Sequence, residues 1–146
     1  MKLSWLEANV MRNKVNRIII DTNLWISFLI TKDFTKLDQI IFLRQGILVF
    51  SQELLDEFLE VARRPKFRRF FSSTDIEEIL ETIDEYANFV KVQTKIELCR
   101  DAKDNFLLSL SIDGRADFLL TGDKDLLDLN KFGETTIITI ADFLIP

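Results

Sequence analysis

The sequence contains no histidine, and this absence removes the most common catalytic base and metal ligand. The Ser-His-Asp and Cys-His arrangements of hydrolases, the two-histidine zinc helix and histidine-ligated haem are therefore excluded. Cys99 is the single cysteine, so the chain forms neither an internal disulfide nor a multi-cysteine zinc site. Because a catalytic thiol would need a histidine partner, we interpret Cys99 as a packing residue, and the scarcity of cysteine indicates a reducing compartment.

Long apolar runs and linker residues are also scarce. No apolar run approaches the roughly 18 residues of a membrane span, and the first 16 residues lack the apolar stretch of a secretory signal. We therefore expect a cytoplasmic protein without a membrane partner. Four glycines and two prolines among 146 residues leave little room for linkers. We expect one domain over residues 1–146, in which residues 1–16 form an appended arm or helix.

The composition that is present suits a folded enzyme. Apolar residues make up 47% of the chain and include 13 phenylalanines, which is enough to build a core. The net charge of −5 excludes a protein that binds nucleic acid through an overall basic surface. It does not exclude an enzyme whose bound cations reverse the sign of charge at a local site.

Short apolar runs alternate with segments of helical spacing along the chain. Strands are predicted at 17–20, 47–50, near 89–92, at 117–120 and at 135–140. Helices are predicted between these strands. Their predicted start signals are Asn23, Thr35, Ser51, the Thr74–Glu77 capping box and Asp101, and Gly46 and Gly114 are predicted to follow helix ends. A short helix is also predicted at 125–129. Apolar strands separated by helices predict an α/β fold with a parallel sheet covered on both faces.

Four acidic residues fall on segments that lead from a strand into a helix. Asp21 directly follows the 17–20 strand, and Asp123 follows the 117–120 strand after two residues. Asp104 lies in the first turn of the helix that Asp101 opens, and Glu57 lies in the helix after the 47–50 strand. Because right-handed crossovers place such segments at one edge of a parallel sheet, we expect the four carboxylates to gather there.

Glu57 is one of four acids on its helix. At roughly 100° per residue it lies nearest to the apolar face, whereas Glu53, Asp56 and Glu60 point more squarely to solvent. This position ranks Glu57 first, and the neighbouring Glu53 and Glu60 remain alternatives for the second acid of the site.

Each acid also has an ordinary structural interpretation. Asp21 and Asp101 can be helix caps, Asp104 a first-turn acid, Asp123 a turn residue and Glu57 part of a solvated helix face. Four coincidences at one edge are a weaker explanation than one shared site. Two carboxylates about 4 Å apart repel by roughly 4 kcal/mol at an effective dielectric constant of 20. Such a cluster therefore needs either protons or a hard cation such as Mg²⁺ or Mn²⁺, which supports phosphoryl chemistry without histidine.

With these residues in view, the chain resembles the PIN-domain proteins. It is most similar to the VapC-like branch of bacteria and archaea, which supplies toxin components of toxin–antitoxin pairs. The matching segments, in chain order, are IIIDTNLWISFL, SQELLDEFLEVARRPKF and CRDAKDNFLLSLSIDGRADFLLTGDKDLL, followed by a closing strand and ADFL. They cover nearly everything from Arg17 to the C-terminus.

The resemblance implies a three-layer α/β/α sandwich with a mainly parallel sheet, and a Mg²⁺- or Mn²⁺-dependent ribonuclease that leaves a 5′-phosphate and a 3′-hydroxyl. It implies roles for eight residues: Asp21, Glu57, Asp104 and Asp123 as catalytic metal-binding acids, Asp125 as a further metal-binding acid, Asn23 and Thr121 as polar supports, and Asp101 as a capping acid. Ala102 stands where relatives often have proline, and it is no ligand.

The stretch VARRPKFRRFF interleaves aromatic residues with five basic ones, which are Arg63, Arg64, Lys66, Arg68 and Arg69. In one interpretation it clamps RNA phosphates, with Phe67 or Phe70 available for base stacking. In another it is a solvated loop after a helix, and in a third it holds an acidic partner such as an antitoxin.

The leading hypothesis is therefore a metal-dependent endoribonuclease that is the toxin of a type II toxin–antitoxin pair, with RNA as substrate and an antitoxin as partner. The alternative is a PIN fold that binds RNA or an antitoxin as a scaffold with weak turnover, although the complete set of four acids favours the enzyme. A receiver domain with a phosphorylated aspartate fits the DTN and TGDKD motifs poorly. Dimers are common among PIN domains, so a homodimer is the default expectation.

Overall fold

A six-stranded sheet forms the centre of the protein in the computed structural model, which describes residues 14–146. The strands are β1 (Asn16–Ile20), β2 (Gly46–Phe50), β3 (Ala87–Phe89), β4 (Phe118–Leu120), β5 (Lys131–Phe132) and β6 (Thr135–Ile138). Their order across the sheet is β3-β2-β1-β4-β6-β5, and every neighbouring pair is parallel except β5 with β6. The predicted mainly parallel sheet is confirmed. Most of the predicted N-terminal arm lies outside the described residues.

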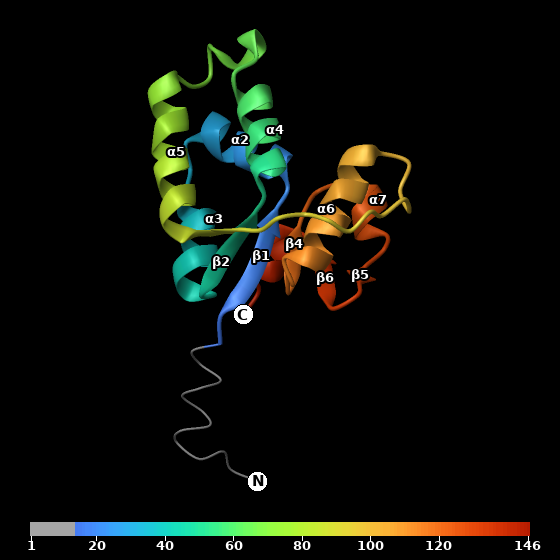
Figure 1. Ribbon diagram of the computed structural model, residues 1–146. Helices are drawn as coiled ribbons and strands as arrows, with labels where there is room; N and C mark the ends of the chain where they lie inside the picture. The colour runs from blue at the N-terminus through green and yellow to red at the C-terminus, as the bar shows by residue number, and fades with distance from the viewer. Residues whose placement is uncertain (1–13) are drawn as a thin grey trace, which may run out of the picture.

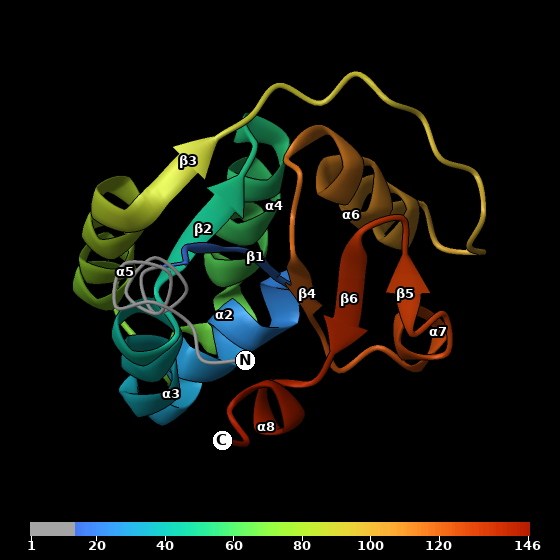
Figure 2. The same cartoon turned by 90° about the horizontal axis from the view of Figure 1, so that it is seen from below.

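Helices cover both faces of this sheet and give the α/β/α layers. They are α2 (Thr22–Thr31), α3 (Thr35–Asp38) continued by a π-helical turn (Gln39–Leu43), α4 (Gln52–Ala62), a 3₁₀ turn (Pro65–Phe67), α5 (Ser73–Tyr86), α6 (Ala102–Asp113), α7 (Lys124–Leu127) and α8 (Ile140–Phe143). In Figure 2, α6 lies on one side of the sheet, and α2, α3 and α8 lie on the other. None of the described helices is long and apolar enough to cross a membrane.

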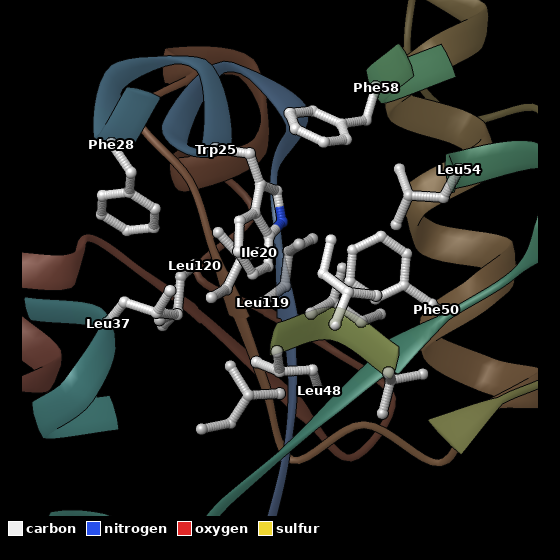
Figure 3. Packing of buried hydrophobic residues seen from close by; sticks show 14 of the residues in the cluster. Ile20, Trp25, Phe28, Leu37, Leu48, Phe50, Leu54, Phe58, Leu119 and Leu120 are labelled. Carbon is white, nitrogen blue, oxygen red and sulfur yellow. The ribbon is translucent and has the colours of Figure 1, made fainter. Parts of the chain in front are cut away.

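The central strand β1 is buried on both faces, as its run of three isoleucines predicts. Ile18, Ile19 and Ile20 are each at most 2% exposed. Beyond the end of β1, Trp25 on α2 packs against Phe50 and Phe58, with ring centroids 5.7 and 6.2 Å apart (Figure 3). These contacts join α2 to β2 and α4. They therefore fix the relative positions of α2, which follows β1, and α4, which follows β2.

Two helix ends differ from the sequence prediction in the segment before β2. Thr35 is the first residue of α3, and the N-cap position is Phe34; the Asp33 carboxylate accepts a hydrogen bond from the Thr35 amide at 3.0 Å. Gly46 opens β2, and Gln45 takes the left-handed conformation at φ 51°. Glycine is needed at 46 because a Cβ there would lie 2.8 Å from the Ile40 carbonyl oxygen.

Two N-terminal caps also differ. The capping box of α5 is formed by Ser72 and Asp75, two residues before the predicted Thr74–Glu77 pair. Both sets carry the same S/T-x-x-D/E pattern, and the structure uses the one nearer to the preceding 3₁₀ turn. Asn23 lies within the first turn of α2, whose N-cap position is Asp21. The predicted caps Ser51 and Asp101 are confirmed, as is Gly114 at the end of α6.

Candidate active site

Asp21 stands at the carboxyl end of β1 and is held there by β4 and the residue after it. The Asp21 amide donates to the Leu120 carbonyl at 3.0 Å, which continues the ladder between the two strands by one residue. The Thr121 hydroxyl donates to Asp21 Oδ2 at 2.8 Å, and Thr121 Oγ1 accepts from the Asp123 amide at 3.0 Å. One threonine thus fixes both Asp21 and the turn that carries Asp123. Burial raises the pKa of Asp21, and the Thr121 hydrogen bond opposes that effect in part.

Asp104 is the most deeply buried of the predicted acids. It lies in the first turn of α6, whose N-cap Asp101 accepts a hydrogen bond from the Lys103 amide at 2.8 Å. Asp104 is only 4% exposed, and its Oδ2 atom has no hydrogen-bond partner among the described residues. Burial raises the pKa of Asp104 to about 6, and the negative charges of Asp123 and Asp101 act in the same direction.

Three carboxylates approach one another closely at the start of α7. Asp123 is the N-cap of α7 and accepts from the Asp125 amide at 2.8 Å. One oxygen each from Asp104, Asp123 and Asp125 lie within 4.8 Å of one another. The guanidinium group of Arg100 pairs with Asp125 at 3.1 Å in an exposed position. A set made only of carboxylate oxygens is the donor type that Mg²⁺ and Mn²⁺ prefer, and the unpartnered buried oxygen of Asp104 fits such a cation.

Glu57 approaches the same region from α4. Its carboxylate lies 3.5 Å from the hydroxyl of the buried Thr22 and 3.3 Å from Lys103 Nζ, and its side chain is 26% exposed. Glu53 is exposed, and Glu60 turns outward to pair with Arg64 at 2.9 Å. Of the acids on this helix, the structure therefore brings Glu57 toward Asp21 and Asp104.

These groups line one pocket of about 170 Å³ at the carboxyl edge of the sheet. Its wall carries five acidic residues, Asp21, Glu57, Asp101, Asp104 and Asp123, and three basic ones, Arg64, Lys66 and Lys103. Asn23 also lines it, whereas Asp125 and Thr121 are not among its lining residues and each forms a hydrogen bond with Asp123. Most of the lining residues come from α2, α4 and the beginnings of α6 and α7, whose ribbons are labelled in Figure 1.

The basic stretch after α4 does not form one continuous wall. Arg64 and Lys66 line the acidic pocket together with Phe67. Arg63 and Arg68 instead line a separate hollow of about 460 Å³ near the start of α5. Arg69 lies over the ring of the exposed Phe70, 4.8 Å from its centroid. The split begins before the 3₁₀ turn at 65–67, because the adjacent residues Arg63 and Arg64 already line different hollows.

The sequence reasoning did not single out Thr22, Lys103 or Arg100, although each contacts one of the predicted acids. Thr22 and Lys103 are the chain neighbours of Asp21 and Asp104, so their positions next to the acids were a usable signal. Arg100 contacts Asp125, which is 25 residues further on. Only the fold reveals that contact.

Known proteins share sequence with this chain. The family model described as "PIN domain" matches residues 17–125, which contain every acid discussed above. An uncharacterized protein of Methanocaldococcus jannaschii is 30% identical over 122 residues, covering 80% of this chain and 78% of that protein. A search of the solved structures gave no match.

Proposed function

The chain belongs to the PIN domain family, whose members are generally nucleases, and on this premise we propose that it is a metal-dependent endoribonuclease. The substrate is RNA, and hydrolysis leaves a 5′-phosphate and a 3′-hydroxyl. The observation that carries the proposal is the convergence of acids from four separate segments on one small pocket at the carboxyl edge of the sheet.

The proposed ligands form two groups. Asp104, Asp123 and Asp125 offer three oxygens within 4.8 Å, and Oδ2 of Asp104 is buried without a hydrogen-bond partner among the described residues. A bound Mg²⁺ or Mn²⁺ ion would lower the pKa of a water molecule and neutralise charge on the phosphodiester. Asp21 and Glu57 face this group from β1 and α4, and the fixed position of Asp21 on Thr121 suits it to orient the attacking water.

Binding of an anionic strand is assigned to the rim of the pocket. Arg64 and Lys66 can contact backbone phosphates, and Phe67 beside them offers an aromatic surface for a base. Arg63, Arg68 and Arg69 lie further out, so their contribution is to general attraction of the strand.

The biological role that we propose is the toxin of a type II toxin–antitoxin pair in the cytoplasm, with the antitoxin as a protein partner and a homodimer as the working form. The resemblance to the toxin branch over the segments around Asp21, Glu57 and Asp104 supports this role. The hollow lined by Arg63 and Arg68, which is separate from the acidic pocket, supplies a basic surface for an acidic partner segment. The whole chain would act as one PIN-like domain.

The direct test is cleavage of labelled single-stranded RNA with added Mn²⁺, with and without a chelator. The Asp21→Asn variant is compared with Asp128→Asn, which removes an exposed acid outside the pocket. We expect wild type and Asp128→Asn to cut, and chelator or Asp21→Asn to lower the rate at least 100-fold. Cleavage that survives both changes would reject the assigned site. Binding of RNA without cleavage would favour a PIN-fold scaffold.

A further inference from the structure

Three basic side chains line the acidic pocket, and each is engaged differently. Arg64 pairs with the exposed Glu60 at 2.9 Å, and Lys66 lies over the Phe67 ring, 5.1 Å from its centroid. Lys103 alone among them forms an ion pair, within the described residues, with an acid of the pocket: its Nζ lies 3.3 Å from Glu57 Oε1.

The Lys103–Glu57 pair crosses the pocket. Lys103 comes from the first turn of α6, one residue before Asp104, and Glu57 comes from α4 on the other wall. The lysine side chain is 61% exposed, whereas that of Glu57 is 26% exposed. The more solvent-exposed member of the pair is therefore the cation, and its flexible stem lets it leave without a change in the backbone.

A divalent cation and a lysine ammonium group can each neutralise the negative charge of a carboxylate. Glu57 faces other acids across a small cavity, and without positive charge that arrangement is repulsive. Lys103 supplies one positive charge to this wall. When Glu57 turns to a bound cation, the lysine must give up the pair.

We propose that Lys103 is a positioning residue that holds Glu57 in the cation-free protein and competes with the divalent cation for it. This inference rests on the proposed function, because it requires that the pocket bind a divalent cation. Lys103 would then affect the cation concentration at which the pocket binds a divalent cation. It also keeps Glu57 on the pocket wall before that point.

The test measures Mn²⁺ affinity directly, through the free Mn²⁺ signal in electron paramagnetic resonance at pH 7.5 and low salt, without RNA. Lys103→Met removes the competing charge. Lys124→Met is the matched control, because Lys124 adjoins Asp123 but forms no ion pair within the described residues. We expect Lys103→Met to bind Mn²⁺ about 1.5- to 5-fold more tightly than the control, the range that a partly exposed ion pair supports.

Two further variants make the result specific. Lys103→Arg keeps the charge, so its Mn²⁺ affinity should stay within twofold of wild type. In a Glu57→Gln background, Lys103→Met should change the affinity no more than the control does, because the pair is already absent. Circular dichroism and the Tm of each variant establish that it is folded.

The outcomes separate the two levels of the argument. If wild type binds no Mn²⁺, or Asp104→Asn binds it as well as wild type, the proposed cation site fails and this inference fails with it. If wild type binds and Asp104→Asn does not, but Lys103→Met equals the control or binds more weakly, the competition is rejected while the cation site stands. A lower Tm with unchanged Mn²⁺ affinity would show Lys103 to be a structural counter-ion only.

Discussion

The negative charge of Asp104 lowers the free energy of unfolding of the cation-free protein. Replacing Asp104 by asparagine should therefore stabilise the fold. Asp104 is 4% exposed, and burial raises its pKa from 3.8 to about 6. At about 1.4 kcal/mol per pH unit, this corresponds to about 3 kcal/mol of lost stability at neutral pH. Neighbouring acids that titrate together with Asp104 reduce the effect, so we expect a gain of about 1–3 kcal/mol for Asp104→Asn.

The sign follows from which state binds the proton more tightly. Below pH 3.8 the carboxyl group is protonated in both the folded and unfolded states, so the penalty is absent. Between pH 3.8 and about 6 the unfolded state releases its proton first, and the stability of wild type falls as the pH rises. Asparagine has no such step, and its amide can donate toward Asp123 as the protonated acid would.

The assay is urea unfolding of metal-free protein at several pH values between 4 and 7.5, for wild type, Asp104→Asn and the exposed control Asp128→Asn. Acids elsewhere affect all three proteins alike, so the difference between wild type and Asp104→Asn reports Asp104 together with the acids whose titration is coupled to it. That difference should grow from near zero at the lowest pH to its full value at pH 7. A difference that is constant with pH, or a variant less stable than wild type at pH 7, would refute the reasoning.

Three stability predictions concern parts of the fold away from the pocket, each measured by urea unfolding. Ser72→Ala should cost about 1 kcal/mol through loss of the α5 cap, whereas Thr74→Ala should cost less than half of that; equal losses would contradict the observed capping box. Gly114→Ala should cost about 1–3 kcal/mol, because its Cβ would lie 2.5 Å from a β2 side chain; an unchanged midpoint would contradict this close packing. Asp113 accepts hydrogen bonds from the 93–94 segment, and these lower its pKa below 3.8. The stability advantage of wild type over Asp113→Asn, present at pH 7, should shrink as the pH falls from 3.8 through the lowered pKa of the folded state, and an advantage that does not shrink would contradict the assignment.

The strands and the edge that gathers the acids could be predicted because their signals are local. Three consecutive isoleucines followed by Asp21 predict a buried strand with a polar residue at its end. The apolar runs at 47–50 and 118–120 do the same for the neighbouring strands. Parallel pairing then places the carboxyl ends together without further information.

The features that were missed depend on contacts between distant segments. Ser72 and Thr74 carry equivalent capping patterns, and the path of the preceding turn selects between them. The antiparallel strand β5 has only two residues, too few to leave a periodic pattern. Glu57 could be ranked above its neighbours from helical spacing alone, but its contacts with Thr22 and Lys103 come from α2 and α6.

The place of β1 between β2 and β4 has a consequence for the growing polypeptide. β2 and α4, the helix that carries Glu57, can pack with β1 early in synthesis. Asp21, however, is held by Thr121, which is 100 residues later in the chain. Asp104 and Asp123 also emerge in the last third of the chain. The pocket, with any activity that it has, therefore cannot assemble while translation of the first two thirds is under way. On the proposed function, a nascent chain at that stage would lack an assembled site for cleaving RNA.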